Sequence, residues 1–255
     1  MNEIEPRPKK KKTGRIILPV LLVLLLGGAV YFFQFTKMGY LFSVPFRPGF
    51  EKLSEHVYIN KAYAGDKNAA LALVEEAEAR DSAFYGSLGY REETYLIISD
   101  DPAFFQKVRS EGKDTVSYPF PFKTDYITLS DEYLNLDITA HEITHAELHH
   151  RLTANARKRI PTWFDEGLAV QNDYREQYSE ENWIEQTDSG KTATALEDMD
   201  EPSEFYAGEA EDRRFRYMRA KHEVAGWMAE HGQAGLLELI DRLNSGEDFH
   251  AAYGK

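Results

Sequence analysis

The stretch LNLDITAHEITHAELHHRL, residues 134–152, contains the pattern that decides the fold expected around it. Its apolar residues and two of its histidines recur at steps of three and four, which places them on one stripe of a single helix. The members of the stripe are Leu134, Ile138, His141, His145, Leu148 and Leu152. We therefore expect a helix that turns both histidines toward the interior of the protein.

Within this helix the sequence HEITH, residues 141–145, sets two imidazoles one turn apart on the same face, close enough to bind one metal ion. Glu142 lies beside them, where its carboxylate can hold a water molecule without being a ligand itself. Zinc in such a site needs a third protein ligand and keeps a fourth position open. A single histidine on an apolar face is more often a packed core residue, but this pair with its glutamate favours a metal site.

The chain before this helix reads as mixed α and β. Apolar extended runs predict three strands, at residues 56–60, 94–99 and 126–129. Asp66 is placed to cap a helix that continues to about residue 80, and residues 102–109 predict a shorter one.

After residue 134 helices dominate, which makes the fold class α+β with a small sheet in the N-terminal part. A second helix is expected from Thr162, with Asp165 three residues later completing a capping box. Two further helices are predicted at about 212–231, ended by Gly232, and at 236–243. Residues 175–211 are acidic and rich in Ser, Thr, Gly and Pro, which is typical of a long surface excursion.

The N-terminus has the pattern of a membrane anchor. Residues 16–35, IILPVLLVLLLGGAVYFFQF, carry no charge and are long enough to cross about 30 Å of hydrocarbon as a helix. The basic arm at residues 1–15 should stay in the cytoplasm, which puts the body on the other side. A cleaved signal peptide with a core at 16–26 is the alternative. Residues 36–56, with Pro45, Pro48 and Gly49, suggest a linker into a domain at 57–255.

Charge and cysteine content exclude several classes of function. Residues 1–15 hold six Lys or Arg against two Glu, and the rest of the chain has 24 basic and 41 acidic residues, a net charge of −17. Such an acidic body is a poor partner for nucleic acid. The absence of cysteine excludes disulfides, thiolate metal sites and a cysteine nucleophile.

The sequence PTWFDEGLAV, residues 161–170, resembles the segment that supplies the third zinc ligand in gluzincin metallopeptidases, where a Trp-x-x-Glu-Gly-x-Ala pattern carries a metal-binding glutamate. The resemblance puts Glu166 in that position, at a spacing from His145 similar to that in thermolysin and the aminopeptidase branch of the same superfamily. It implies a zincin-like catalytic domain over about residues 90–250, closest to the small bacterial peptidase-MA-like proteins. An ordinary surface glutamate is the competing interpretation of Glu166.

The same resemblance bears on two further elements. YMRA, residues 217–220, is similar to the Tyr-x-Lys-Gly element of the aminopeptidase branch, which implies that Tyr217 supports an oxyanion, although a packing role competes and His222 is a weaker alternative. The Gly-x-Met-Glu-Asn segment that binds a free amine in that branch has no counterpart before residue 141, so an endopeptidase is favoured. Asn172, Asp173 and His149 are candidates for orienting a ligand histidine.

These patterns together predict a membrane-anchored zinc peptidase that acts on a peptide or protein substrate, with Zn²⁺ held by His141, His145 and Glu166 and with Glu142 as general base. The strand at 126–129 is a candidate edge for an extended substrate. A non-catalytic zinc-stabilised binding module of the cell envelope is the alternative function, and a hydrolase of another substrate class is a third.

Overall fold

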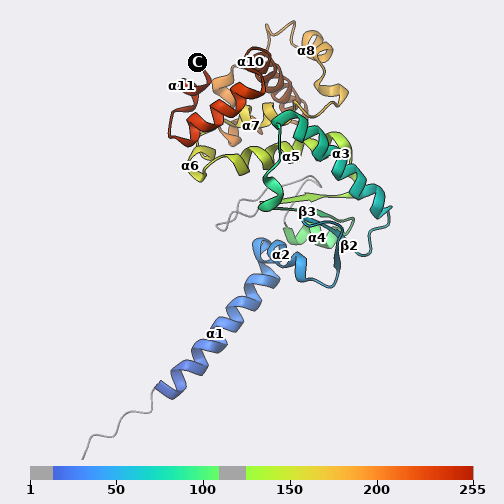
Figure 1. Ribbon diagram of the computed structural model, residues 1–255, viewed down its shortest axis with the longest axis vertical. Coiled ribbons are helices and arrows are strands. Elements are labelled where there is room, and N and C mark those ends of the chain that lie inside the picture. Colours follow the sequence, from blue (N-terminus) through green and yellow to red (C-terminus); the bar gives the residue numbers. More distant parts are fainter. Residues whose placement is uncertain (1–13, 109–124, 255) are drawn as a thin grey trace, which may run out of the picture.

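The computed structural model describes residues 14–108 and 125–254, which form a long N-terminal helix and a folded body (Figure 1). All but the last two residues of the basic arm lie outside the described part. Helix α1, Gly14–Phe35, projects from the body on the side of the sheet, and the mainly helical part lies farther from it (Figure 1). The stretch Leu18–Phe35 of α1 is long and apolar enough to cross a membrane, with a mean hydropathy of 2.1, and none of it is buried in the body.

Residues 36–56, which the sequence suggests to be a linker, are folded and belong to the body. They contain helix α2 (Lys37–Ser43), the 3-10 helix η1 (Val44–Phe46) and strand β1 (Phe50–Lys52). Leu41, Val44 and Phe50 are buried in a core that they share with the sheet. Pro45 occupies the first turn of η1, where its fixed φ suits a helix start, so it marks a tight turn and not a flexible joint.

The sheet has four strands in the order β1-β2-β3-β4. The last three are β2 (Val57–Asn60), β3 (Thr94–Ile98) and β4 (Asp125–Leu129). β1 is antiparallel to β2, and the other neighbours are parallel, with Leu96 opposite both Val57 and Ile127. The three predicted strands are confirmed to within one residue at each end. β1 was not predicted, because three residues are too few for a periodic signal.

Alternate side chains of the sheet enter two different cores. On one face Val57, Ile59, Leu96, Ile98, Ile127 and Leu129 pack with residues of α3 (Lys67–Tyr85) and α5 (Leu136–Arg151). On the other face Tyr58, Ile97 and Tyr126 pack with α2, η1 and α4 (Pro102–Val108). This period of two is that of strands covered on both sides. Because Ile138, Ile143 and Ala146 hold α5 on the sheet, another face of α5 is left for the helical part.

The helices of the first half follow their sequence signals. The Asp66 carboxylate caps α3 by accepting hydrogen bonds from the backbone N–H groups of Asn68 and Ala69. The helix continues past the predicted residue 80 to Tyr85, and Gly86 ends it with a φ of 84°, a conformation that glycine adopts without strain. Helix α4 matches its prediction up to residue 108, and residue 109 is outside the described part.

The second half is built from helices. They are α5, α6 (Ala154–Arg157), α7 (Thr162–Ala169), α8 (Glu180–Gln186), α9 (Pro202–Phe205), α10 (Ala210–Asn244) and α11 (Phe249–Tyr253). The short 3-10 helices are η2 (Tyr90–Glu92), η3 (Asp131–Tyr133), η4 (Glu176–Tyr178) and η5 (Leu196–Met199). The two predicted helices around Gly232 are confirmed as two halves of α10, which Gly232 interrupts with a φ of 63° and a ψ of −169°.

Two expectations for this half were wrong in detail. The start of α7 has no capping box, because Pro161 is its N-cap and makes no side-chain cap, while Asp165 is engaged elsewhere. The acidic segment 175–211 is not only a surface excursion. It contributes buried apolar side chains to the body, namely Tyr178, Trp183, Leu196, Met199 and Phe205.

Candidate metal centre

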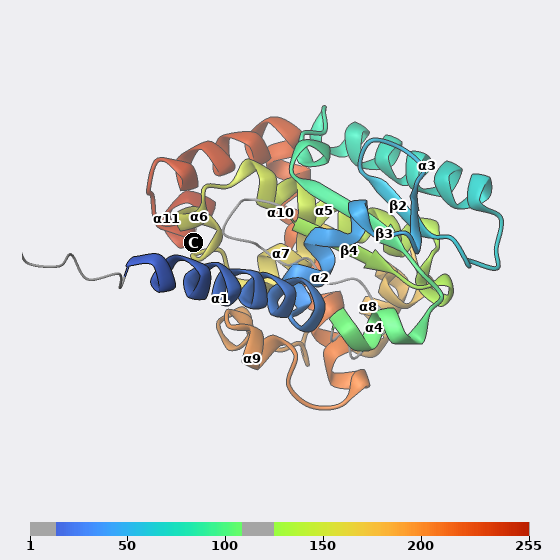
Figure 2. The same ribbon diagram turned by 90° about the horizontal axis from the view of Figure 1, so that it is seen from below.

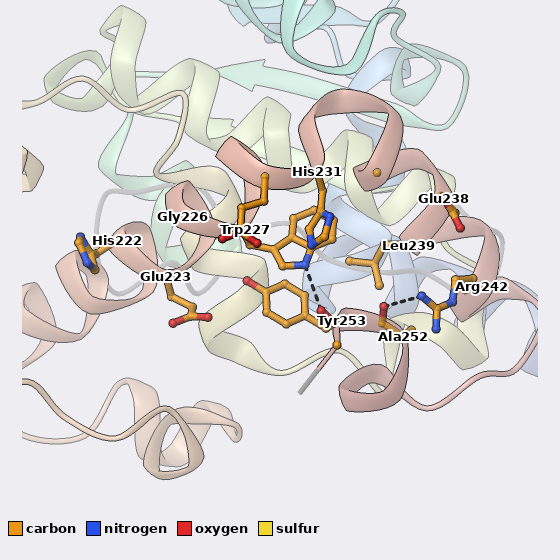
Figure 3. A pocket seen from close by; sticks show the side chains of 13 residues that line it. His222, Glu223, Gly226, Trp227, His231, Glu238, Leu239, Arg242, Ala252 and Tyr253 are labelled. Atoms are coloured by element: carbon orange, nitrogen blue, oxygen red, sulfur yellow. Dashed lines mark hydrogen bonds between the residues drawn. The ribbon is translucent and has the colours of Figure 1, made fainter.

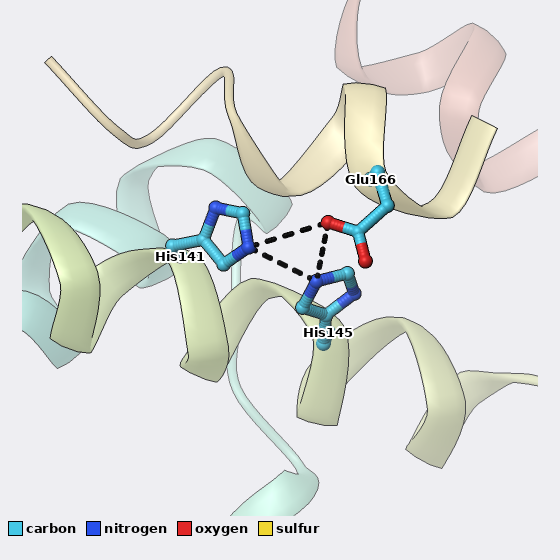
Figure 4. A group of neighbouring side chains, drawn as sticks. All are labelled: His141, His145 and Glu166. Atoms are coloured by element: carbon cyan, nitrogen blue, oxygen red, sulfur yellow. Dashed lines mark hydrogen bonds and ion pairs between the residues drawn. The ribbon is translucent and has the colours of Figure 1, made fainter. Parts of the chain in front are cut away.

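Helices α5 and α7 bring His141, His145 and Glu166 together, and all three side chains are buried (Figure 4). The Nε2 atoms of the two histidines lie 3.2 Å apart. Oε2 of Glu166 lies 3.5 Å from Nε2 of His141 and 3.4 Å from Nε2 of His145. The three atoms therefore form a nearly equilateral triangle, with each side chain approaching its centre (Figure 4).

The triangle has the size that a tetrahedral metal site requires. Donor atoms about 2.0–2.1 Å from one zinc ion in a tetrahedron lie about 3.3 Å from each other. Within the described residues, Oε2 of Glu166 is buried and accepts no hydrogen bond. Leaving a buried carboxylate oxygen without a partner is costly, and a cation would supply that partner. Two imidazoles and one carboxylate also form a donor set that zinc accepts, so the residues fit the ion.

A second group of His and Asp side chains beside the triangle has different spacings. Oδ1 of Asp165 lies 2.6 Å from Nδ1 of His145, and its Oδ2 lies 2.9 Å from Nε2 of His149. These are hydrogen-bond distances, too short for two ligands of one tetrahedral ion. The Asp165 carboxylate therefore accepts a hydrogen bond from each ring. In the neutral form of His145, this bond at Nδ1 leaves the lone pair of Nε2 facing the triangle.

Burial and charge act against each other in this network. Burial lowers the pKa of His145, but the carboxylates of Asp165 and Glu166 outweigh it and raise that pKa well above its ordinary value. Burial likewise opposes ionisation of Asp165, yet His149 and His145 hold its pKa well below the ordinary range. The same balance lowers the pKa of Glu166, through His145 and His141. The centre thus favours positive charge between its carboxylates.

His141 has its own carboxylate neighbour. Oδ2 of Asp173 lies 3.8 Å from Nδ1 of His141. Burial alone would raise the pKa of Asp173, but hydrogen bonds from Arg175 and the charge of His141 lower it. Of the neighbours Asn172 and Asp173, which the sequence could not separate, Asp173 is therefore the one beside His141. The Asn172 amide donates instead to Asp81 and Thr144.

The Asn172 amide belongs to a polar cluster that ties α5 to α3. The hydroxyl of Thr144 donates to Oδ1 of Asp81 over 2.5 Å, and the Asn172 amide donates to the same oxygen over 2.8 Å. Asp81 is fully buried, and burial raises its pKa to about 8 in spite of these two hydrogen bonds. Thr144 immediately precedes His145, so this cluster fixes the helix turn that carries the histidine pair.

Tyr206 is a residue of the site that the sequence did not reveal. Its hydroxyl donates a hydrogen bond to Oε1 of Glu166, the carboxylate oxygen turned away from the histidines. Burial and the charge of Glu166 raise the pKa of Tyr206, which keeps the hydroxyl protonated. Tyr206 follows α9, where the neighbouring Phe205 is buried against the Tyr217 ring at 5.0 Å between centroids. The segment interpreted as a surface excursion therefore reaches the candidate metal centre.

Glu142 and Tyr217 also lie at the centre. Glu142 is half-buried on α5, next to His141. Tyr217, on α10, has its ring 6.3 Å from that of His141 between centroids. Burial raises the pKa of Tyr217 well above its ordinary value, and the carboxylates of Glu166 and Glu142 add to the effect. His222 points elsewhere, stacking on Trp183 at 4.6 Å between ring centroids.

A cavity of 760 Å³ lies away from this centre, along the second half of α10 and against α11 (Figure 3). Trp227 fills one side of it and donates from its indole N–H to the backbone oxygen of Tyr253. The side chains around it do not form a converging set of ligand atoms of the kind found between α5 and α7. A second cavity, of 550 Å³, is bounded by Asp125, His149 and Arg157 at the far end of the Asp165 network.

A scan of the chain against protein-family models and a search of the curated proteins both find no match. The case for a function therefore comes from the residues themselves. Their arrangement defines a mixed α and β body with one apolar N-terminal helix and a buried His, His, Glu cluster suited to a divalent cation.

Proposed function

We propose that this chain is a zinc-dependent peptidase of the gluzincin type, anchored in a membrane by α1 with its body outside the cytoplasm. One observation carries the proposal. Nε2 of His141, Nε2 of His145 and Oε2 of Glu166 meet at mutual distances of 3.2 to 3.5 Å, and Glu142 follows the first of these residues on the same helix. The zincin-like motif order in the sequence supports the same assignment.

A zinc ion held by His141, His145 and Glu166 would supply a Lewis acid for the scissile carbonyl and would lower the pKa of water toward neutrality. The Glu142 carboxylate takes a proton from the attacking water and passes it to the leaving amine nitrogen. Glu142 suits this role because it is half-buried, follows His141 on α5, and lies close enough to Tyr217 for its charge to raise the pKa of that hydroxyl. The Tyr217 hydroxyl, kept protonated by burial, donates a hydrogen bond to the developing oxyanion.

The substrate expected from the sequence is a peptide or protein chain. β4 is the last strand in the described sheet order, and its chain leads through η3 into α5. The sequence suggested β4 as an edge for an extended substrate, but Tyr126, Ile127, Thr128 and Leu129 are fully buried, so the outer edge of β4 is covered. No described segment resembles the amine-binding element of the aminopeptidase branch, which favours cleavage within a chain over removal of its first residue.

The test is the Glu142→Gln variant of the full-length chain in detergent or nanodiscs. We expect the variant to retain one zinc per chain by metal analysis and to lose hydrolysis of a random-sequence peptide library read by mass spectrometry. Glu76→Gln, an exposed glutamate on α3, is the matched control and should keep both properties.

Two outcomes would contradict the proposal in different ways. A Glu142→Gln variant that hydrolyses the library as fast as the parent would remove Glu142 from the mechanism. A parent chain that binds zinc yet cleaves no member of the library would favour the alternative, a zinc-stabilised binding module of the cell envelope.

A further inference from the structure

Two phenylalanines near the end of α1 are left on the surface of the body. Phe46, the last residue of η1, is 82% exposed, and Phe42, on α2, is 39% exposed. Removing apolar surface from water is favourable, so the exposed ring of Phe46 and the smaller exposed part of Phe42 are unfavourable in water. Their neighbours Leu41 and Val44 are buried, which means that α2 and η1 present one apolar side to the body and another outward.

Both phenylalanines lie at the level of the last turn of α1. The rings of Phe42 and Phe33 are 6.1 Å apart between centroids. The guanidinium of Arg47, the residue after Phe46, donates to the backbone oxygen of Phe33 over 2.6 Å. Helix α2 lies beside the end of α1 (Figures 1 and 2). With these contacts, the outward apolar side of α2 and η1 is continuous with the apolar surface of α1.

The connection between α1 and α2 is close-packed. A Cβ on Gly39 would lie 2.1 Å from the backbone oxygen of Phe32, so only glycine allows the two helices to approach this far. The Thr36 hydroxyl donates to the same oxygen over 2.7 Å and accepts from the Gly39 N–H over 3.0 Å. Because α2 also packs against α4 through the core that contains Leu41, the body cannot rotate freely about the end of α1.

Two cationic side chains, Arg47 and Lys107, lie at the junction between α1 and α2. The Arg47 guanidinium covers the Tyr40 ring at 3.6 Å. The Lys107 ammonium, on α4, donates to the backbone oxygen of Gln34 over 3.4 Å and lies 5.7 Å from the Phe35 ring. Aromatic rings with Lys and Arg at the end of an apolar helix are typical of the boundary between acyl chains and headgroups.

We propose that α2 and η1 lie in the interfacial layer of the same bilayer that α1 spans, with Phe42 and Phe46 among the acyl chains and Arg47 and Lys107 at the headgroup phosphates. The body is thereby held on the membrane in one orientation, with its sheet toward the lipid and the metal centre on the far side of the sheet. This inference rests on the membrane-spanning role of α1 in the proposed function and is independent of the peptidase activity.

The test places tryptophan reporters in the full-length chain in phosphatidylcholine vesicles with brominated acyl chains, which quench tryptophan only at membrane depth. We expect the emission of the Phe46→Trp reporter to fall about twofold or more relative to unbrominated vesicles, as for a side chain buried in the interfacial layer. The native tryptophans all lie in the helical half and form a constant background. The Tyr174→Trp reporter, at a residue 63% exposed on that half, is the matched control and should not be quenched.

A reporter within α1, Leu26→Trp, separates failure of this inference from failure of the anchor. If bromine quenches the Leu26→Trp reporter but not the Phe46→Trp reporter, α1 spans the bilayer and the interfacial role of α2 and η1 is wrong. If neither is quenched, the anchor itself is wrong. If the Phe46→Trp reporter is shielded from water only at high protein concentration and bromine does not quench it, a second copy of the chain covers this surface. That outcome would overturn the inference.

Discussion

The hydroxyl of Tyr206 donates a hydrogen bond to Oε1 of Glu166, while Oε2 of the same carboxylate faces His141 and His145. The two oxygens of Glu166 thus have separate partners. Tyr206 prevents the carboxylate from rotating and selects the oxygen that approaches the histidines. Removing a group that orients a metal ligand in this way typically lowers metal affinity by about 10- to 100-fold.

The Tyr206→Phe variant should therefore bind zinc about tenfold more weakly than the parent. The phenyl ring keeps the packing beside Phe205 and removes only the donor to Glu166. Affinity is measured by competition with a chelator of known zinc affinity. Tyr174→Phe removes a hydroxyl from an exposed tyrosine elsewhere and should leave the affinity unchanged. Equal losses in the two variants would show that the hydrogen bond to Glu166 does not position the ligand.

Asp165→Asn should weaken zinc binding more strongly, by about 10- to 100-fold. An asparagine side chain has one acceptor oxygen, so it cannot accept from both His145 and His149 as Asp165 does. Its neutral amide also removes a negative charge that favours a cation nearby. The same chelator competition measures the loss. Asp188→Asn, which removes an exposed aspartate paired with Lys191, controls for the change in net charge. An Asp165→Asn variant with parental affinity would exclude Asp165 as the residue that orients His145.

The sequence was sufficient for those parts of the fold that have a local signal. The three- and four-residue steps from Ile138 to Leu148 identified α5, because a helix with one side in the protein interior repeats its inward-facing residues at that period. Apolar runs identified the three longer strands, and Asp66 and Gly232 marked a helix start and a break. These signals depend only on residues within a few positions of each other.

The parts that escaped prediction depend on contacts between distant residues. Tyr206 lies 40 residues after Glu166 in an acidic, polar segment, and nothing near it in the sequence indicates that its hydroxyl meets a buried carboxylate. Asp165 fits a helix start by composition, and its two histidine partners become visible only when α5 and α7 are side by side. Residues 36–56 looked like a linker because prolines and glycine mark tight turns as well as flexible segments.

Asp81→Asn should make the chain more stable at neutral pH and less sensitive to pH. The pKa of Asp81 is about 8 in the folded chain against an ordinary value of 3.8, so the folded chain keeps a proton that the unfolded chain releases between those values. The free energy of unfolding is therefore highest below about pH 4 and falls as the pH rises toward 8. Asparagine has no such proton, and its amide oxygen still accepts from Thr144 and Asn172.

The gain for Asp81→Asn at pH 7 is at most about 4 kcal/mol, from about three pKa units at 1.36 kcal/mol each. Urea unfolding followed by tryptophan fluorescence, with chelator present to remove metal linkage, measures it at about pH 5 and about pH 7.5. The advantage of the variant over the parent should increase with pH. An advantage that is the same at both values would mean that Asp81 does not carry the proton.

The last prediction concerns Gly167, the residue after Glu166. A Cβ at Gly167 would lie 2.6 Å from the backbone oxygen of Ala220 and 2.8 Å from Cγ2 of Val224, so glycine is what lets α7 pack directly on α10. Gly167→Ala forces the two helices apart, which should destabilise the chain by about 1–3 kcal/mol. Because Glu166 is on the displaced helix, zinc affinity should fall as well.

At Gly226, an exposed glycine on α10, an added Cβ meets no atom within 4 Å. Gly226→Ala should therefore raise stability by about 0.5–1 kcal/mol through helix propensity and leave zinc affinity unchanged. Urea unfolding and chelator competition on both variants separate the two effects. If Gly167→Ala instead gains stability as Gly226→Ala does, the space between α7 and α10 accommodates the added methyl group. The position of Glu166 is then not set by this close contact.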